Sequence, residues 1–406
     1  MTAEEQREAN YFIDLGIKVG TVFTPNAPID KRSLFSGRTS QIRRVSDIIF
    51  QKGNHAIIFG ERGVGKTSLA QVLQEFLPTQ QNLVVTRVNC DAADNFLSVW
   101  KKVFDGISFV QSRTGMGYAP QDQIELFSLA SFLKETENVP HQVFKALQQV
   151  PSEVILVVII DEFDRLGNEV RPLFADFIKM LSDNSLPITI ILTGVGESVD
   201  ELVSNHQSVS RSMAQIQMPR MTNKEIEDII TNGLMILDGM TISDTVLQKI
   251  VLLAKGLPHY AHLLGLHVCR DALDNQRKDI NDDNMNHAII KALEDCQRSI
   301  RTNYFNGIRS TKKISLFVDV LLACALAEVN ELGEFSVGDL RHPLQRITGK
   351  NYEIPAFAKH LSEFCESKRG NILIKTGERK RFRYKFRDPL MQPFIIMQGI
   401  TNGKNL

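Results

Sequence analysis

The sequence lacks the segments that would place it in or across a membrane. No apolar run reaches about 18 residues, the length that a transmembrane helix needs, so we predict no membrane partner. The N-terminal stretch MTAEEQREANYFIDLG is polar and acidic, unlike a secretory signal. The five cysteines form no CxxC pair; they are Cys90, Cys269, Cys296, Cys324 and Cys365. This pattern argues against disulfides and structural zinc, and predicts a reduced, cytoplasmic protein.

The sequence also lacks an excess of charge of either sign. The 47 Lys and Arg residues balance the 47 Asp and Glu residues, which leaves a formal net charge of zero. Any nucleic-acid contact must therefore come from a local patch. No fixed-period repeat and no low-complexity tract is present. Hydrophobic residues make up 43% of the 406, which is ordinary for a globular protein with two or three domains.

The strongest positive signal is a phosphate-binding loop. The apolar strand 55–59 leads into GERGVGKT at 60–67, and an amphipathic helix follows, which matches GxxxxGK[ST] in its required context. Glycines let the backbone approach phosphates, and the helix N-terminus adds a favourable dipole. We expect Lys66 to reach the β and γ phosphates and the Thr67 hydroxyl to ligate Mg²⁺. The expected phosphate-binding residues are Gly60, Glu61, Arg62, Gly63, Val64, Gly65, Lys66, Thr67 and Ser68.

A second motif, EVILVVIIDEFDRLG, spans 153–167. Seven consecutive apolar residues, 154–160, predict a strand buried on both faces of a parallel sheet. Acidic residues at the carboxyl end of such a strand lie in the ligand crevice. We expect Asp161 to hold Mg²⁺ and Glu162 to polarise the attacking water. The alternative is a surface acidic turn after a core strand.

Three more strands complete the predicted sheet. Residues 83–90 form one of them. Residues 187–195 form the strand expected to lie, within the sheet, between the phosphate-loop strand and the acidic strand. Residues 214–219 form the strand that flanks the phosphate-loop strand on its other side. Thr193 falls near the end of the second of these strands. It is either a polar sensor of the γ-phosphate or a threonine chosen for its β propensity.

These motifs together resemble the AAA+ and STAND classes of P-loop ATPases. The resemblance implies an α/β P-loop NTPase of the ASCE type, with strand order 5-1-4-3-2, that binds ATP or ADP with Mg²⁺. The segment 24–45 is similar to the entry motif F-x-G-R-x-x-E. Phe35, Gly37 and Arg38 match it, whereas Gln41 stands where the classes often have Glu. This motif implies adenine binding, and no NKxD-type guanine motif is present.

A helical lid is predicted after the sheet. Thr222 and Glu225 form a capping box at its start, and helices follow at 243–255, 259–276 and 282–300. The related lids often begin their third helix with an arginine. Here Gly256-Leu257-Pro258-His259 stands there, a form similar to that of STAND ATPases and of some initiator relatives. Pro258 and His259 either approach the nucleotide phosphates or only begin a helix.

The resemblance also raises the question of an arginine finger. Arg211 lies just before the fifth strand, where related initiators carry the arginine that reaches a neighbouring subunit's γ-phosphate. The alternative is a solvated arginine on a loop, and Arg220 is a weaker candidate. The fourth strand ends without the TTR-like arginine of the STAND class.

A C-terminal winged-helix domain is predicted. Helices are expected at 312–328, 335–347 (with Ser336 as N-cap) and 356–367, and a β-hairpin over 372–387 turns at Thr376-Gly377. The hairpin is basic, and its alternation is expected to expose the basic residues and bury the aromatic ones. That face either binds DNA phosphates or is a solvated part of a protein-interaction domain. The expected DNA-contacting residues are Arg379, Lys380, Arg381, Arg383 and Lys385.

The predicted organisation has four parts: an N-terminal segment (1–35), a P-loop ATPase core (36–220), a helical lid (221–305) and a winged helix (310–400). We predict a slow, partner-regulated ATPase that acts as a switch. It either forms homo-oligomers or controls a separately encoded effector, with bacterial antiviral defence as one setting. The alternative is a DNA-binding ATPase similar to initiators or transposition regulators. A metabolic kinase is disfavoured because no acceptor site is evident.

Overall fold

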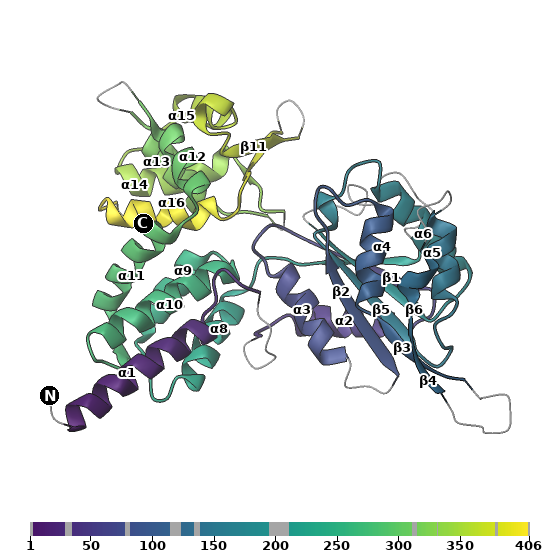
Figure 1. Ribbon diagram of the computed structural model, residues 1–406. Helices are drawn as coiled ribbons and strands as arrows, with labels where there is room; N and C mark the ends of the chain where they lie inside the picture. Colours follow the sequence, from purple (N-terminus) through teal and green to yellow (C-terminus); the bar gives the residue numbers. More distant parts are fainter. Residues whose placement is uncertain are drawn as a thin grey trace, which may run out of the picture. The chain divides into compact units, whose positions relative to one another are not determined.

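The computed structural model describes residues 3–28, 35–77, 82–113, 123–133, 139–194, 211–310, 315–330, 332–377 and 381–404. Contacts divide the chain into two units (Figure 1). The sheet unit comprises Pro28–Glu61 and Gly65–Met218. The helical unit comprises Met1–Ala27, Arg62–Val64 and Pro219–Leu406.

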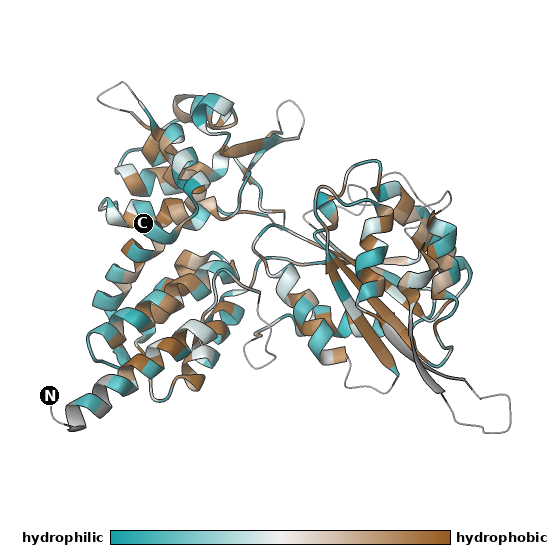
Figure 2. Ribbon diagram, in the orientation of Figure 1, coloured by the Kyte–Doolittle hydropathy of each residue, from teal (hydrophilic) through white to brown (hydrophobic). Residues whose placement is uncertain are grey.

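The sheet unit is built on five parallel strands. They are β1 (His55–Phe59), β2 (Leu83–Asn89), β5 (Ile155–Asp161), β6 (Ile188–Gly194) and β7 (Met213–Gln217). Their spatial order is β2-β5-β6-β1-β7, with every neighbouring pair parallel. Counted along the chain, this is the predicted 5-1-4-3-2 order, so the predicted P-loop α/β fold is confirmed. The central strands β5 and β6 are buried because their residues are almost all apolar (Figure 2).

Helices cover both faces of this sheet. One face carries α2 (Thr39–Ile49) and α3 (Lys66–Phe76), and the other carries α4 (Phe96–Asp105), α5 (Val139–Leu147) and α6 (Arg171–Asp183) (Figure 1). The second face buries an aromatic cluster in which Phe96, Trp100 and Phe177 meet edge to face or tilted. The sheet unit also contains short elements: β3 (Ser108–Arg113), β4 (Gln123–Ser128), η3 (Leu129–Phe132) and η4 (Phe163–Arg165).

The first part of the helical unit packs around a central helix, α10. Its elements are α1 (Ala3–Val22), α8 (Asn223–Ile236), β8 (Thr241–Ile242), α9 (Asp244–Ala254), α10 (Pro258–Asp274), β9 (Asp279–Ile280) and α11 (Asp282–Asp295). Phe23, which follows α1, is buried against Gly233 of α8 and Gly265 of α10. A Cβ at either glycine would lie less than 3 Å from the Phe23 ring, so these glycines make room for it. The predicted capping box of Thr222 and Glu225 is present.

The junction between α9 and α10 is the predicted tight turn. Lys255 and Gly256 have positive φ, 49° and 73°, and Pro258 is the first residue of α10. A Cβ at Gly256 would lie 2.6 Å from the carbonyl oxygen of Met221, whose N–H donates to the Gly256 carbonyl at 2.8 Å. The turn therefore requires glycine both for its backbone angles and for this close approach.

The second part of the helical unit combines helices with a small antiparallel sheet. Its elements are α12 (Arg298–Ile308), α13 (Phe317–Leu326), β10 (Phe335–Ser336), η5 (Gly338–Leu340), α14 (Arg341–Thr348), α15 (Ile354–Phe364), η6 (Ser367–Arg369), β11 (Leu373–Thr376), β12 (Arg383–Phe386) and α16 (Met391–Thr401). The predicted pairing of β11 with β12 is present, and β10 adds a third strand to β12. This region is consistent with the predicted lid and winged helix.

Two helix predictions in this unit are wrong. The helix expected over 282–300 ends at Asp295, because Cys296 and Gln297 leave helical geometry with ψ near 140°, and α12 begins at Arg298. The helix expected from 335 begins at Arg341 instead. Ser336 is not its N-cap; it lies in β10 opposite Arg383. Helix α16 was not predicted. Among the helices of the described ranges, none is long and apolar enough to cross a membrane.

Candidate functional site

The phosphate loop connects the end of β1 to the start of α3. Gly60 follows β1, and a Cβ there would collide with the carbonyl oxygen of Met218, whose N–H donates to Phe59 at 2.7 Å. Gly65 precedes α3 with φ 96° and offers no side chain to cap the helix. No N-cap side chain therefore competes for the N-terminus of α3, the place where a helix favours a phosphate. Within this loop, Arg62–Val64 are grouped with the helical unit.

Lys66 lies inside the loop rather than in solvent. Its Nζ donates to the carbonyl oxygens of Gly60 and Glu61, at 3.0 Å and 2.7 Å, and the residue is 9% exposed. Thr67 and Ser68 follow in the first turn of α3 and are half-buried. The residues that bind phosphate and metal in the sequence hypothesis therefore sit at the carboxyl edge of the sheet.

Asp161 ends β5 at the same edge, because β1, β6 and β5 are parallel neighbours. The residue is 1% exposed. Its Oδ1 accepts from the Thr193 hydroxyl and from the Glu162 N–H at 3.0 Å. Its Oδ2 accepts from Arg87 Nη2 at 2.9 Å. The structure thus brings two predicted residues, Asp161 and Thr193, into direct contact, with the Thr193 hydroxyl donating to the carboxylate.

The partner that sequence reasoning missed is Arg87, on β2. It lies opposite Ile159 in the register, so it shares a sheet face with Asp161 two residues further along β5. Nη1 of its guanidinium donates to Gln71 Oε1 on α3, while Nη2 donates to Asp161. The arginine side chain is 12% exposed. The available signal was a charged residue within the otherwise mostly apolar stretch LVVTRVNC.

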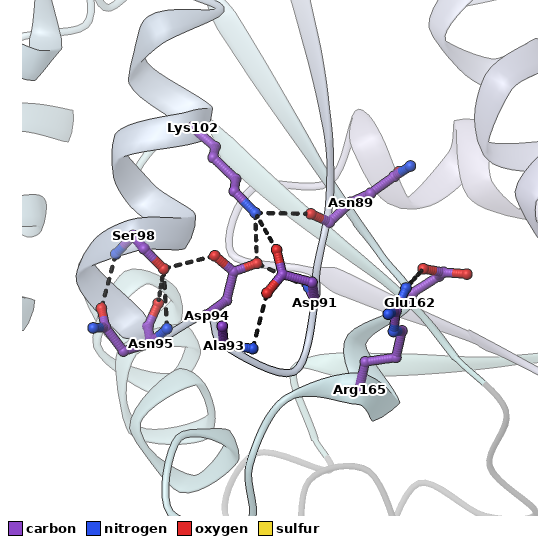
Figure 3. Close-up of polar contacts among 9 residues, drawn as sticks. All are labelled: Asn89, Asp91, Ala93, Asp94, Asn95, Ser98, Lys102, Glu162 and Arg165. Atoms are coloured by element: carbon purple, nitrogen blue, oxygen red, sulfur yellow. Dashed lines mark hydrogen bonds and ion pairs between the residues drawn. The ribbon is translucent and has the colours of Figure 1, made fainter.

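Glu162 is in a different environment from its neighbour. It adopts a left-handed backbone, φ 55°, and its side chain is 47% exposed. One carboxylate oxygen accepts from Arg165 Nη1 at 2.8 Å, an ion pair visible in Figure 3. The hydrogen bond to Glu162, together with its charge, raises the pKa of Arg165. The predicted water-polarising carboxylate is therefore accessible and held by one exposed arginine.

A second charged cluster, which was not predicted from the sequence, stabilises the loop that follows β2. Lys102 of α4 donates to Asp94 at 2.6 Å, to Asp91 at 3.3 Å and to the Asn89 carbonyl at 3.3 Å (Figure 3). Burial raises the pKa of Asp94, but the hydrogen bonds from Lys102, the Asp91 N–H and Ser98 outweigh it, so that the pKa is lowered. This cluster fixes the loop between β2 and α4.

The entry segment forms a tight turn in the sheet unit. Gly37 and Arg38 have positive φ, 71° and 61°, and the Arg38 carbonyl accepts the first helical N–H of α2, from Ile42, at 3.0 Å. Arg38 is buried and Phe35 is half-buried. The turn orients α2 along β1 and β7. The adenine-binding role of Phe35, Gly37 and Arg38 stays a prediction.

His259, in the first turn of α10, has a neighbour within the helical unit. Its Nδ1 lies 2.8 Å from the carbonyl oxygen of Pro25. Burial lowers its pKa, so the ring is neutral near pH 7 and Nδ1–H donates to that carbonyl. In this arrangement Nε2 is an acceptor and not a phosphate donor. The phosphate-facing roles of Pro258 and His259 remain predictions.

The two candidate arginine fingers differ. Arg211 is exposed, two residues before β7, as a residue that reaches another subunit must be. Arg220 donates to Gln392 Oε1 of α16 at 2.5 Å and to the Lys255 carbonyl at 3.4 Å, which holds it inside the helical unit. Arg211 is therefore the better placed of the two.

The predicted basic face of the hairpin needs a correction. Arg381 and Arg383 are exposed, but Lys385 is 9% exposed and does not belong to that face. In this sheet β12 is the middle strand of three, between β10 and β11. Tyr384 and Phe386 are buried, as predicted, beside Phe335 of β10. Arg379 and Lys380 lie outside the described residues.

Comparisons with known proteins show what this chain is similar to. Residues 50–203 match the model of a family described as "AAA domain". No curated protein matches the chain. Two similar solved structures are the Orc1 protein of Aeropyrum pernix in complex with DNA and the ORC2 protein of the same organism in ADPNP–ADP complexes. For each, the TM-score is 0.50, the sequence identity is 15%, and the match covers 94% of this chain and 97% of the other. The Walker-type ATPase PABY2304 of Pyrococcus abyssi is also similar (TM-score 0.50, 16% identity, 92% of this chain and 99% of the other). At these identities the likeness shows the fold. Residues 50–203 are thus similar to an AAA domain, and the sheet that they help to form has the P-loop α/β fold.

Proposed function

We propose that this protein is an AAA+ ATPase that binds and slowly hydrolyses ATP. The observation that carries the proposal is the shared edge of the parallel sheet, where Lys66 lies in the loop after β1 and Asp161 ends β5. A cationic loop and a buried carboxylate on one edge are what a magnesium–nucleotide site needs. The AAA family match supports the same conclusion.

The residues present fit ATP with Mg²⁺. The Thr67 hydroxyl and the Asp161 carboxylate are hard oxygen ligands of the kind that Mg²⁺ prefers, and the backbone of residues 60–68 would bind the phosphates. When bound, Mg²⁺ neutralises charge on the phosphates. Lys66 would exchange its two loop carbonyls for phosphate oxygens. The entry turn of Phe35, Gly37 and Arg38 would bind adenine.

Hydrolysis requires a residue that orients water and accepts its proton. Glu162 takes this role, because it is exposed at the edge where Asp161 is buried. The ion pair between Glu162 and Arg165 is exposed and therefore weak, so Glu162 can leave Arg165 and contact a water molecule instead. Thr193 holds Asp161 through its hydroxyl, which gives this threonine a positioning role beside the predicted sensor role.

The direct test is equilibrium binding of fluorescent ATP and GTP analogues, with Mg²⁺ and with EDTA, to the parent protein. We expect saturable ATP binding that Mg²⁺ strengthens, and weaker GTP binding. Equal affinity for both nucleotides would contradict the adenine assignment. No binding of either would overturn the proposal.

We propose further that the ATPase acts as a switch that forms homo-oligomers or controls a separately encoded effector. The Gly256-Leu257-Pro258 junction, with no arginine, and the exposed Arg211 support this role. The test is light scattering of the Glu162→Gln variant with ATP, alone and with each protein encoded beside it. We expect larger particles with ATP than with ADP. A monomer under every condition contradicts the switch.

DNA binding is the second candidate function, and the exposed Arg381 and Arg383 favour it. The similar Orc1 structure was solved in complex with DNA, which supports the same candidate. Exposed positive charges neutralise phosphates in a salt-dependent way. Retention of a duplex at about 50 mM salt that disappears by about 200 mM would support it. No retention at the lower salt would reject it.

A further inference from the structure

Arg87 links two elements of the candidate site. Its guanidinium donates through Nη1 to Gln71 on α3, the helix that begins with Lys66, and through Nη2 to Asp161 on β5. The residue sits on β2, next to β5 in the sheet and on the face that α3 covers. One rigid side chain thus contacts both the helix after the phosphate loop and the buried carboxylate.

The chemistry of the contact suits this placement. A guanidinium is planar and presents its donors in a fixed fork, whereas an ammonium is a point charge on a flexible stem. The other two donors to Asp161, the Thr193 hydroxyl and the Glu162 N–H, both reach Oδ1 and carry no charge. Arg87 donates to Oδ2 and supplies the positive charge that offsets this carboxylate, whose side chain is 2% exposed.

We propose that Arg87 is a positioning residue for the magnesium–nucleotide site. Its fork sets the separation between α3 and Asp161, so that the carboxylate is already in place when the phosphates and their metal bind. Preorganised supporting contacts of this kind change metal affinity by about 10–100-fold. The inference rests on the proposed function and deepens it by assigning a residue that neither motif contains.

Lys102, in the same sheet unit, serves as a control for the alternative that Arg87 only stabilises the fold. Lys102 also pairs with a carboxylate of low exposure, Asp94, and also lies at the carboxyl side of β2. Its Nζ donates to the Asn89 carbonyl, to Asp91 and to Asp94, and none of these residues belongs to the phosphate loop, α3 or β5. A substitution of Lys102 therefore removes an ion pair and leaves the Arg87 contacts with Gln71 and Asp161 in place.

The experiment measures binding of N-methylanthraniloyl-ATP to full-length protein, with excess Mg²⁺ and with EDTA. In the parent, the ratio of the two affinities defines the contribution of the metal. We expect Arg87→Gln to lower the Mg²⁺-supported affinity by about 10-fold or more, while the affinity in EDTA changes less than about 2-fold. Lys102→Met should change neither affinity by more than about 2-fold.

Two further variants separate fork geometry from charge. Arg87→Lys keeps the charge and loses the fork, so we expect it to rescue less than half of the loss in logarithmic affinity. Gln71→Leu removes one arm and leaves the pair with Asp161, so we expect an approximately 3-fold loss with Mg²⁺ and none in EDTA. These two variants also decide the question if Arg87→Gln does not fold, as judged by circular dichroism.

The outcomes are distinct. An unchanged or tighter Mg²⁺-supported affinity in Arg87→Gln, or in both Arg87→Lys and Gln71→Leu, overturns the inference. Equal losses with Mg²⁺ and with EDTA also overturn it, because they indicate general damage to the site. A parent protein that binds no nucleotide overturns the proposed function itself, and this result is visible before any variant is made.

Discussion

The acidic edge of the sheet unit and the small sheet of the helical unit hold their charges in opposite ways. Asp161 is 1% exposed and accepts from three donors on three different residues, whereas Arg381 and Arg383 are exposed. A buried charge depends on each individual partner, and losing one partner is costly. Exposed charges act by number and are screened by salt.

The two regions should therefore respond to different perturbations. At the sheet edge, a single substitution that preserves the shape of the side chain should be enough to change nucleotide binding or hydrolysis. At the small sheet, only combined substitutions or a change of ionic strength should matter. The Glu162–Arg165 pair is intermediate between these cases. Glu162 follows Asp161 directly in the sequence, but both side chains of the pair are about half exposed.

The largest effect is expected from Lys66→Ala. The change removes the cation that sits inside the loop, so saturable nucleotide binding should be lost, by about 100-fold or more, in calorimetry. Lys52→Ala, an exposed lysine of the same unit, is the matched control and should bind normally. An affinity equal to that of the parent in Lys66→Ala would contradict the nucleotide-binding role of this loop. It would also contradict the expectation that the sheet edge is the more sensitive region to single substitutions.

Glu162→Gln should separate binding from hydrolysis. We expect nucleotide affinity within about 2-fold of the parent and phosphate release slowed by about 10²–10⁴-fold, because an amide cannot accept the proton. Arg165→Ala, which removes only the exposed partner of Glu162, should keep hydrolysis at or above the parental rate. Hydrolysis at the parental rate in Glu162→Gln would refute the water-polarising role.

The third effect, on stability, should be shared by both units. Burial lowers the pKa of His55, in the sheet unit, and of His262, in the helical unit, to about 4 from 6.5. Between these values the unfolded chain binds protons that the folded chain does not, so the free energy of unfolding falls as the pH falls through 6.5. At pH 5 the loss is about 2 kcal/mol for each histidine.

Urea denaturation at pH 7.5 and pH 5 measures this loss. His55→Gln and His262→Gln should each reduce the difference between the two pH values, whatever their effect at pH 7.5. A free energy of unfolding that is the same at both pH values in the parent would show that neither ring stays neutral in the folded state.

The smallest effect is expected at the small sheet. The double variant Arg381→Ala with Arg383→Ala should weaken duplex retention by about 3–10-fold at low salt and flatten its salt dependence. Lys385→Ala should affect folding rather than retention, because this lysine is buried. Equal loss of DNA from Lys385→Ala, with the fold intact by circular dichroism, would contradict the assignment of the exposed face.

The fold of the sheet unit was predictable because its signals are local. The apolar run before Asp161 and the loop around Lys66 each lie in one short stretch of sequence. The strand order was implied by the resemblance that these motifs carry, and it is observed. The capping box at Thr222 and the turn at Gly256 were predictable for the same reason. Each depends on residues within a few positions.

The rest depended on partners far away along the chain. Arg87 could be matched to Asp161, 74 residues later, only once β2 and β5 were neighbours. The strand position of Ser336 depends on β10 pairing with β12, 47 residues later in the sequence, at Arg383. Which residues can bind phosphate and metal follows from residue type and local spacing, because that chemistry is local. Which charges are buried follows from how the elements pack, because burial and pairing are properties of elements that meet in space.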